Sequence, residues 1–184
     1  VRAFVRDQAL PVIPEHFEAG TFPRELIPGL AELGVLGMHL HGYGCAGASA
    51  TAYGVASEEL EAGDSGLRSF VSVQGSLAMF PISAYGSEEQ KQRWLPEMAA
   101  GRAIGCFGLT EPDAGSDPSS MRTAARRDGR DRILDGTQLR LTNERMSDIA
   151  RAPARTDEAG PALLDARSLP GAPPSAPPHH PPYL

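Results

Sequence analysis

The sequence predicts an α+β fold, in which a helical N-terminal part is followed by a smaller part built from strands. In residues 1–101 the apolar side chains recur at helical spacing, which predicts an all-α domain. In residues 102–158 short apolar runs alternate with turn residues, which predicts a partial β-domain. Residues 159–184 are rich in proline and have no period, so we expect a disordered tail.

Bulk composition argues against several classes of function. The net charge of −6 disfavours a nucleic-acid partner, because binding to phosphates needs a basic surface. No apolar run reaches the ~20 residues that a membrane-spanning helix needs, and the opening VRAFVRDQAL does not resemble a secretion signal. Cys45 and Cys106 lack metal-type spacing, and His39 and His41 have no evident third partner, so we expect reduced thiols and no metal site.

Local signals place several helices in the N-terminal part. Ser87, followed three residues later by Gln90, is a capping box and predicts a helix over SEEQKQRWLPEMAAG. Ser49 or Thr51 is expected to cap a helix over AYGVASEELEAGD. A buried helix is predicted for GLRSFVSVQGSLAMFPISAYG, because this run is mostly apolar and small. Pro28 predicts a kink or a restart, since proline lacks the backbone donor.

Weaker signals predict strands in the second part. The run AIGCF (103–107) is typical of a buried strand. The run RILDGTQLRLTN predicts a hairpin around Asp135-Gly136, a dipeptide that favours tight turns. A further strand is expected in SDIARAPART, although Pro153 cannot donate a hydrogen bond to a neighbouring strand.

The polar loop GLTEPDAGSD (108–117) follows the first predicted strand and has the character of a binding loop. Gly115 and Ser116 let backbone N–H groups approach an anion, because no bulky side chain intervenes. Thr110 and Ser116 add hydroxyls that donate or accept hydrogen bonds. We therefore expect the loop to bind a phosphate or a flat heteroaromatic edge, and the alternative is a plain surface loop with local turns.

The same loop resembles the signature of acyl-CoA dehydrogenases, in which small-apolar-(Ser/Thr)-Glu is followed by Gly-(Ser/Thr)-Asp. Four longer matches are similar to the glutaryl-CoA dehydrogenase branch in particular. They are GYGCAG (42–47), ELEAGDSGLRS (59–69), YGSEEQKQRWLP (85–96) and GCFGLTEPDAGSDPSSM (105–121). The resemblance is close to about residue 125 and looser to about residue 158. It implies an N-terminal helical domain and a middle β-domain, with the family's C-terminal helical bundle absent.

This resemblance implies a site for FAD. The residues expected to bind it are Phe107, Gly108, Leu109, Thr110, Gly115, Ser116 and Thr142. Among them, Leu109 and Thr110 would lie at the isoalloxazine edge, and Gly115 and Ser116 near the pyrophosphate and the thioester. Thr142 matches a threonine that hydrogen-bonds the flavin. Arg140 stands where the family usually has a tryptophan packed on the flavin, so a cation replaces a flat apolar ring.

The resemblance also implies an acyl-CoA substrate, with glutaryl-CoA as the expected one. Arg68 matches the arginine that meets the far carboxylate of the glutaryl group, and Ser69, Ser72 and Ser116 are expected as its substrate-side neighbours. A charge-assisted pair of this kind is worth roughly 1.5–3 kcal/mol. The alternative is an arginine at the start of a helix whose guanidinium extends to water.

The family reaction implied by the resemblance is the α,β-dehydrogenation of an acyl-CoA thioester by a glutamate base and FAD. Glutaryl-CoA then loses CO₂ to give crotonyl-CoA, in lysine and tryptophan degradation, and an electron-transfer flavoprotein accepts the electrons. The family base lies in the C-terminal bundle, so we expect no catalytic residue in this chain and an impaired enzyme. Four glutamates do not match the position of that base: Glu58, Glu59, Glu61 and Glu111.

Several alternatives stay open at this stage. The chain is either a flavin-dependent acyl-CoA dehydrogenase or a non-catalytic remnant that binds flavin or acyl-CoA. Which acyl chain the substrate carries depends on the role of Arg68. Members of the family form homo-oligomers, which is doubtful for a chain without the bundle. The expected compartment is a bacterial cytoplasm, or the mitochondrial matrix in a eukaryote. A shifted reading frame would explain the loss of strand character after ARTDE (154–158), and a natural short protein is the alternative.

Overall fold

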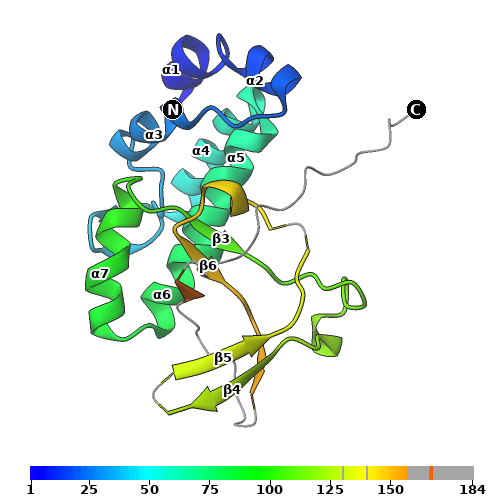
Figure 1. The fold of residues 1–184 in the computed structure, drawn as a ribbon. Helices are drawn as coiled ribbons and strands as arrows, with labels where there is room; N and C mark the ends of the chain where they lie inside the picture. The colour runs from blue at the N-terminus through cyan, green and yellow to red at the C-terminus, as the bar shows by residue number, and fades with distance from the viewer. Residues whose placement is uncertain (130, 140, 157–165, 168–184) are drawn as a thin grey trace.

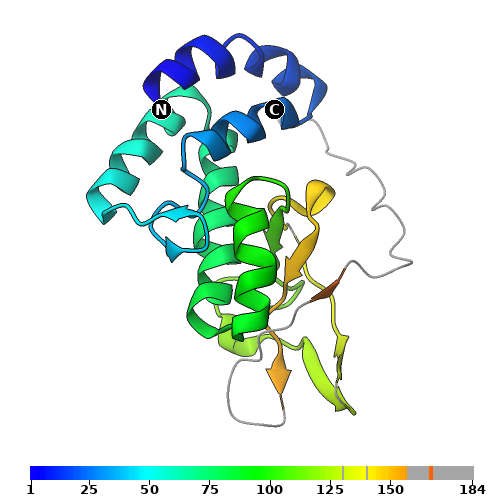
Figure 2. The ribbon, with the colours of Figure 1, turned by 90° about the vertical axis from the view of Figure 1, so that its left-hand side faces the viewer.

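Figure 1 shows the helical and β parts of the chain in a computed structural model, which describes residues 1–129, 131–139, 141–156 and 166–167. The helices form one body, and the strands lie along one side of it in both views (Figures 1 and 2). The α-helices precede the strands of the β part along the chain, and one short ribbon lies between α3 and α4. The 3₁₀-helices Pro118–Ser120 and Glu144–Met146 lie among the strands. The predicted α+β class is therefore confirmed.

The helical part begins at Arg2 and ends at Ala99. Its elements are α1 Arg2–Phe4, the π-helix η1 Val5–Ala9, α2 Ile13–Ala19, the 3₁₀-helix η2 Arg24–Leu26, α3 Ile27–Glu32, α4 Ala50–Gly63, α5 Ser65–Ser72, the π-helix η3 Val73–Met79, α6 Phe80–Tyr85 and α7 Glu88–Ala99. Strands β1 (His41–Gly42) and β2 (Cys45–Ala46) form the ribbon. Pro28 lies in the first turn of α3, where its missing N–H is harmless, so the predicted restart is confirmed.

Side-chain caps fix the beginnings of the longer helices. The Ala52 N–H donates to the hydroxyl of Ser49 at 3.2 Å, which selects Ser49 over Thr51 as the cap of α4. At α7 the predicted capping box is confirmed, since the Gln90 N–H donates to Ser87 and the Ser87 N–H donates to Gln90. Asp64 ends α4 and its carboxylate also caps α5, accepting the Leu67 N–H at 2.7 Å. Helices α4 and α5 therefore meet at a single residue.

Elements α5, η3 and α6 follow one another without a break from Ser65 to Tyr85 and form the predicted buried helix. Its apolar side packs into two buried clusters. The first includes Phe4, Leu30, Leu60, Leu67 and Phe70. The second includes Met79, Ile82, Leu95, Met98 and Ile149, and so joins the helical part to the β part.

The β part contains two small mixed sheets. Their strands are β3 Gly105–Phe107, β4 Ala124–Asp128, β5 Asp131–Asp135, β6 Ile149–Arg151, β7 Arg155–Thr156 and β8 Ala166–Arg167. In one sheet β6 pairs in parallel with β3 and antiparallel with β8, which lies within the segment expected to be disordered. In the other, β4 pairs antiparallel with β5 and in parallel with β7. The rest of residues 159–184 lies outside the described part of the chain.

The predicted hairpin around Asp135-Gly136 is wrong. The hairpin instead joins β4 to β5, with Asp128 opposite Asp131 and with Gly129 at a φ of 59°. Gly136 serves a different purpose, because an added Cβ would lie 2.7 Å from the Cα of Thr123. Glycine is needed there for the close passage of two chain segments rather than for a turn.

Three further observations concern the residues that the structure describes. None of their helices is long and apolar enough to cross a membrane. They contain no group of three or more His, Cys, Asp or Glu side chains placed to hold a metal ion. Cys45 and Cys106 are free thiols, and burial raises the pKa of each.

Candidate functional site

The predicted flavin-binding loop leaves the sheet at the end of β3. Phe107 lies opposite Arg151 of β6 and forms an isolated antiparallel bridge with Thr142. The Gly108 N–H donates to the Arg151 carbonyl at 2.9 Å, which extends the sheet by one residue. The structure thus brings Phe107, Gly108 and Thr142 together, as the sequence predicts for one site.

The segment that precedes Thr142 passes close to the first half of the loop. A Cβ at Gly108 would lie 2.2 Å from Oε1 of Gln138 and 2.9 Å from Cδ2 of Leu141, so a side chain there would displace the ends of these two side chains. The Leu139 N–H donates to the Thr110 carbonyl at 2.7 Å. Arg140 belongs to this segment but lies outside the described residues, so its expected position against the flavin stays a prediction.

A buried carboxylate holds the middle of the loop. Glu111 is 5% exposed, and its oxygens accept the Arg122 N–H at 2.6 Å and the Thr123 N–H at 2.8 Å. Its pKa is lowered from the usual value, chiefly by hydrogen bonding with Thr123 and then by the Arg122 amide. Glu111 and Ala114 also exchange backbone hydrogen bonds of 2.9 and 3.2 Å. The carboxylate therefore fixes the shape of the loop, a role that sequence reasoning missed.

The second half of the loop is exposed. Gly115 and Ser116 both lie at the surface, and a Cβ at Gly115 would meet no atom within 4 Å. Asp117 follows and caps the 3₁₀-helix Pro118–Ser120, accepting the Ser119 N–H at 3.0 Å. The backbone at Gly115 is thus accessible to a ligand, as the anion-binding prediction requires, and its two flanks are fixed by Glu111 and Asp117.

The three predicted substrate residues of the helical part, Arg68, Ser69 and Ser72, share α5 and are half-buried. The Arg68 Nε donates to Oε2 of Glu61 at 2.6 Å, with side chains that are 36% and 47% exposed. The hydroxyl of Ser65 donates to Oε1 of the same carboxylate at 2.7 Å. Hydrogen bonds from Arg68 first and from Ser65 second lower the pKa of Glu61. The guanidinium is therefore held by α4 at the surface of the helix rather than extended freely into water.

One buried glutamine links this helix to the strand that precedes the predicted flavin-binding loop. Gln74 in η3 is 0% exposed, and its Nε2 donates to the carbonyls of Met98 at 3.2 Å and Ala103 at 2.8 Å. Its Oε1 accepts the Gly105 N–H at 2.8 Å. Sequence reasoning missed this residue, although a single amide within the apolar run SFVSVQGSLAMF was a signal that could have drawn attention to it.

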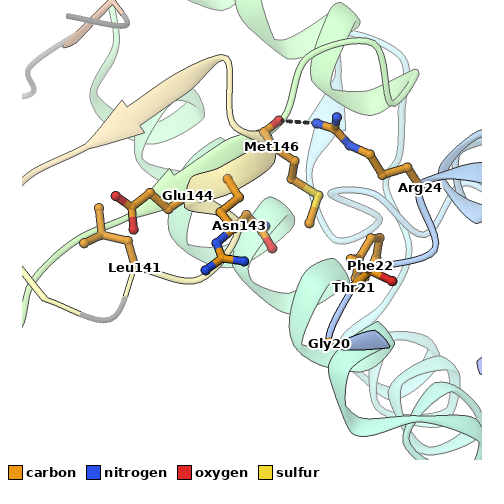
Figure 3. Close-up of a pocket in the computed structure, with 9 residues that line it drawn as sticks. Gly20, Thr21, Phe22, Arg24, Leu141, Asn143, Glu144 and Met146 are labelled. Atoms are coloured by element: carbon orange, nitrogen blue, oxygen red, sulfur yellow. Dashed lines mark hydrogen bonds between the residues drawn. The ribbon is translucent and has the colours of Figure 1, made fainter. Parts of the chain in front are cut away.

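Figure 3 shows a separate cavity of about 620 Å³ between the helical and β parts. It is lined by Gly20, Thr21, Phe22, Arg24, Leu141, Asn143, Glu144, Arg145 and Met146. In the figure Arg24 reaches across to Met146, whose carbonyl accepts a hydrogen bond of 3.3 Å. None of the predicted FAD or substrate residues lines this cavity, although Asn143 adjoins Thr142.

Comparison with known proteins identifies the family. Residues 1–102 match the acyl-CoA dehydrogenase N-terminal domain. The chain belongs to the acyl-CoA dehydrogenase family. Human mitochondrial short-chain specific acyl-CoA dehydrogenase is 35% identical over 86% of this chain and 39% of that protein. Members of the family are flavin-dependent oxidoreductases that act on acyl-CoA.

Solved structures of the family resemble this chain over most of its length. A glutaryl-CoA dehydrogenase from Mycobacterium smegmatis, in complex with FADH2, is 62% identical with a TM-score of 0.83 and covers 85% of this chain and 40% of its own. An acyl-CoA dehydrogenase from Geobacillus kaustophilus is 32% identical with a TM-score of 0.81, covering 91% of this chain and 46% of its own. The chain thus spans less than half the length of these relatives.

Proposed function

We propose that this chain forms the FAD- and acyl-CoA-binding surfaces of a flavoenzyme of the glutaryl-CoA dehydrogenase type. The observation that carries the proposal is the position of Arg68, which lies half-exposed on α5 beside Ser69 and Ser72. A fixed cation at this place suits an acyl chain that ends in a carboxylate. The 62% identity to the M. smegmatis glutaryl-CoA dehydrogenase supports the same assignment.

The loop after β3 has the features that FAD requires. Gly115 leaves its backbone open to a pyrophosphate, and the exposed hydroxyls of Ser116 and Thr142 are free to contact the cofactor. Phe107 and Thr142 face each other across a β-bridge, which sets two sides of the site at a fixed separation. The residues therefore fit FAD, which when bound would accept the β-hydrogen of the acyl chain as hydride.

Arg68 would select a dicarboxylic acyl chain. The pair with Glu61 fixes the guanidinium in place through Nε, which leaves both terminal nitrogens to donate to a substrate carboxylate. A charge-assisted hydrogen bond of this kind is worth roughly 1.5–3 kcal/mol, which corresponds to a preference of roughly ten- to a hundredfold over an uncharged chain. Ser69 and Ser72 add hydroxyls beside the guanidinium.

A second candidate function is binding without turnover. Among the described glutamates, Glu59 accepts a hydrogen bond of 2.8 Å from Arg2, while Glu61 and Glu111 are engaged as described above. Hydrogen bonding from their partners lowers the pKa of all three. A carboxylate with a lowered pKa is a weak base for removing an α-proton. We therefore propose that the described residues bind the ligands without supplying the catalytic base.

The remaining assignments rest on the family. We propose that an electron-transfer flavoprotein accepts the electrons. Glutaryl-CoA, with decarboxylation to crotonyl-CoA, is the proposed substrate of the enzyme type. A bacterial cytoplasm is the proposed compartment.

Titration of the purified chain with FAD tests the cofactor proposal. We expect flavin fluorescence to change saturably, because the isoalloxazine moves from water to the surface near Phe107 and Thr142. A Thr142→Val variant should weaken the binding, since it keeps the shape of the side chain and removes the hydroxyl. No saturable change at any FAD concentration would contradict the proposal.

Calorimetric titration with glutaryl-CoA and butyryl-CoA tests the substrate proposal. We expect glutaryl-CoA to bind roughly ten- to a hundredfold more tightly, and Arg68→Ala to abolish the difference while leaving butyryl-CoA binding unchanged. Arg102→Ala is the matched control, because it removes an arginine from a comparable surface pair with Glu97 at 2.7 Å. Equal loss in both variants would argue against a specific role for Arg68. Turnover of glutaryl-CoA with an artificial electron acceptor would overturn the second candidate function.

A further inference from the structure

Gln74 occupies the place where three segments of the chain meet. It belongs to η3, the π-helical stretch between α5 and α6. Its amide nitrogen holds the Met98 and Ala103 carbonyls, at the end of α7 and in the connection to β3. Its amide oxygen holds the first N–H of β3, at Gly105. All three hydrogen bonds are buried, so water does not compete for them.

The atoms around Gly105 at this junction are so closely packed that no side chain fits there. A Cβ at Gly105 would lie 2.4 Å from Cβ of Ala78 and 2.9 Å from Cε of Met98. Strand β3 therefore passes directly against η3, and only a glycine permits it. On the opposite side, the Asn143 side chain donates to the Gly105 carbonyl at 3.2 Å. The first residue of β3 is thus fixed by one amide side chain on each of its two backbone groups.

The junction lies between the two proposed binding surfaces. Gln74 is six residues after Arg68 along one continuous helical segment, a rise of about 9 Å at helical geometry. Phe107 is two residues after Gly105, about 7 Å along a strand. Gln74 lies in the π-helical stretch of this segment, and π-helical stretches occur frequently at functional sites.

We infer that Gln74 is a positioning residue, which holds β3 and the loop that begins at Phe107 against the helix that carries Arg68. The expected effect on ligand binding rests on the proposed function, since the loop is the proposed FAD site and the helix is the proposed substrate site. Gln74 is fully buried and so lies beneath both proposed binding surfaces rather than on either of them. It sets the separation of the surfaces that bind them, so its loss weakens FAD binding without removing any contact to FAD.

Replacement by methionine tests this inference, because Gln74→Met keeps the length of the side chain and removes all three hydrogen bonds. We expect the dissociation constant for FAD to rise at least about tenfold, by analogy with the 10- to 100-fold effect of residues that hold the ligands of a bound metal. We also expect the Phe107 and Gly108 amides to exchange hydrogen faster in Gln74→Met, with or without FAD.

A matched variant separates positioning from general loss of stability. Ile82 is 2% exposed and belongs to the same apolar cluster as Met98, so Ile82→Val weakens that cluster without altering a hydrogen bond. Both variants are compared at temperatures equally far below their melting points. We expect Ile82→Val to bind FAD within about twofold of the original chain, since it leaves the loop in place.

The positioning role of Gln74 is overturned if Gln74→Met and Ile82→Val bind FAD with equal affinity and if the Phe107 and Gly108 amides exchange hydrogen at equal rates in both variants. If the original chain binds no FAD, the proposed function fails, and the exchange rates alone then support or overturn the positioning role. Should Gln74→Met fail to fold, Gly105→Ala takes its place, because it forces β3 away from Ala78 and predicts the same two changes.

Discussion

The helical part and the β part of this chain are stabilised by different interactions. The helical part has a large apolar core around Phe70 and Leu67, and its longer helices begin at local side-chain caps such as Ser87. The β part has short strands, and buried polar side chains fix their surroundings: Glu111 holds the loop after β3, and Gln74 of η3 holds the first residue of β3. Apolar burial therefore provides the stability of one region, while a few hydrogen bonds set the shape of the other.

Phe70→Ala should have the largest effect on stability. Phe70 is 1% exposed and packs on Phe22 with ring centroids 4.8 Å apart, so its truncation leaves a cavity in the core. We expect the free energy of unfolding to fall by about 3–5 kcal/mol in urea titrations. Phe17 is 78% exposed, and Phe17→Ala should change the same quantity by less than about 0.5 kcal/mol. Similar losses in both variants would contradict an apolar core as the main source of stability.

Gly136→Ala should have the next largest effect, because an added Cβ would meet the backbone of Thr123. We expect a loss of about 1–3 kcal/mol in the free energy of unfolding. Gly115→Ala is the matched control, since its Cβ would enter open space. Its effect on stability should be small, whereas its effect on FAD binding should be clear. An unchanged free energy of unfolding in Gly136→Ala would contradict this prediction, because it would mean that the backbone near Thr123 shifts to make room for the added Cβ.

Ser87→Ala should cost about 1 kcal/mol, because it removes half of the capping box at α7. Differential scanning calorimetry of the two chains measures the change. We expect FAD affinity to stay constant, since the first turn of α7 belongs to the helical part and lies away from the loop. A fall in FAD affinity here would weaken the division between the two regions.

The smallest change should be in the dependence of stability on pH. The folded chain lowers the pKa of Glu111, so its stabilising contribution is present above the ordinary glutamate pKa of ~4.3 and is lost as the pH falls through the lowered value. Glu111→Gln should therefore flatten the acid side of the curve of unfolding free energy against pH. Glu61→Gln should flatten it less, because the Glu61 pair is nearly half-exposed and screened by solvent. Equal slopes in the two variants would contradict the buried role of Glu111.

The division between regions also explains what the sequence could predict. The caps at Ser49 and Ser87 and the restart at Pro28 depend on residues within one helical turn. The cap at Ser87 was predicted outright, whereas Ser49 and the restart were each one of two predicted alternatives. The hairpin was placed at Asp135-Gly136 because a glycine that serves a close contact looks the same in sequence as a glycine that serves a turn. Gln74 was missed because its partners lie 24 to 31 residues away.

The candidate site shows the same pattern. The loop from Phe107 to Ser116 was selected as a candidate site because its glycines and hydroxyls lie close together in the sequence, and its role in binding FAD stays a prediction. Its neighbour Thr142 came only from the resemblance to a family, although the structure places it opposite Phe107. The pairing of Glu61 with Arg68 across two helices could not be foreseen from residue types alone.

Asp64 is the single residue between α4 and α5. Because one residue both closes the first helix and opens the second, no linker is available to absorb a change in chain length. Inserting a single residue into the first turn of α5 would rotate the residues that follow it by about 100° relative to α4. Arg68 would then turn away from Glu61, so the proposed selection of the acyl chain depends on how the two helices are rotated about their shared residue.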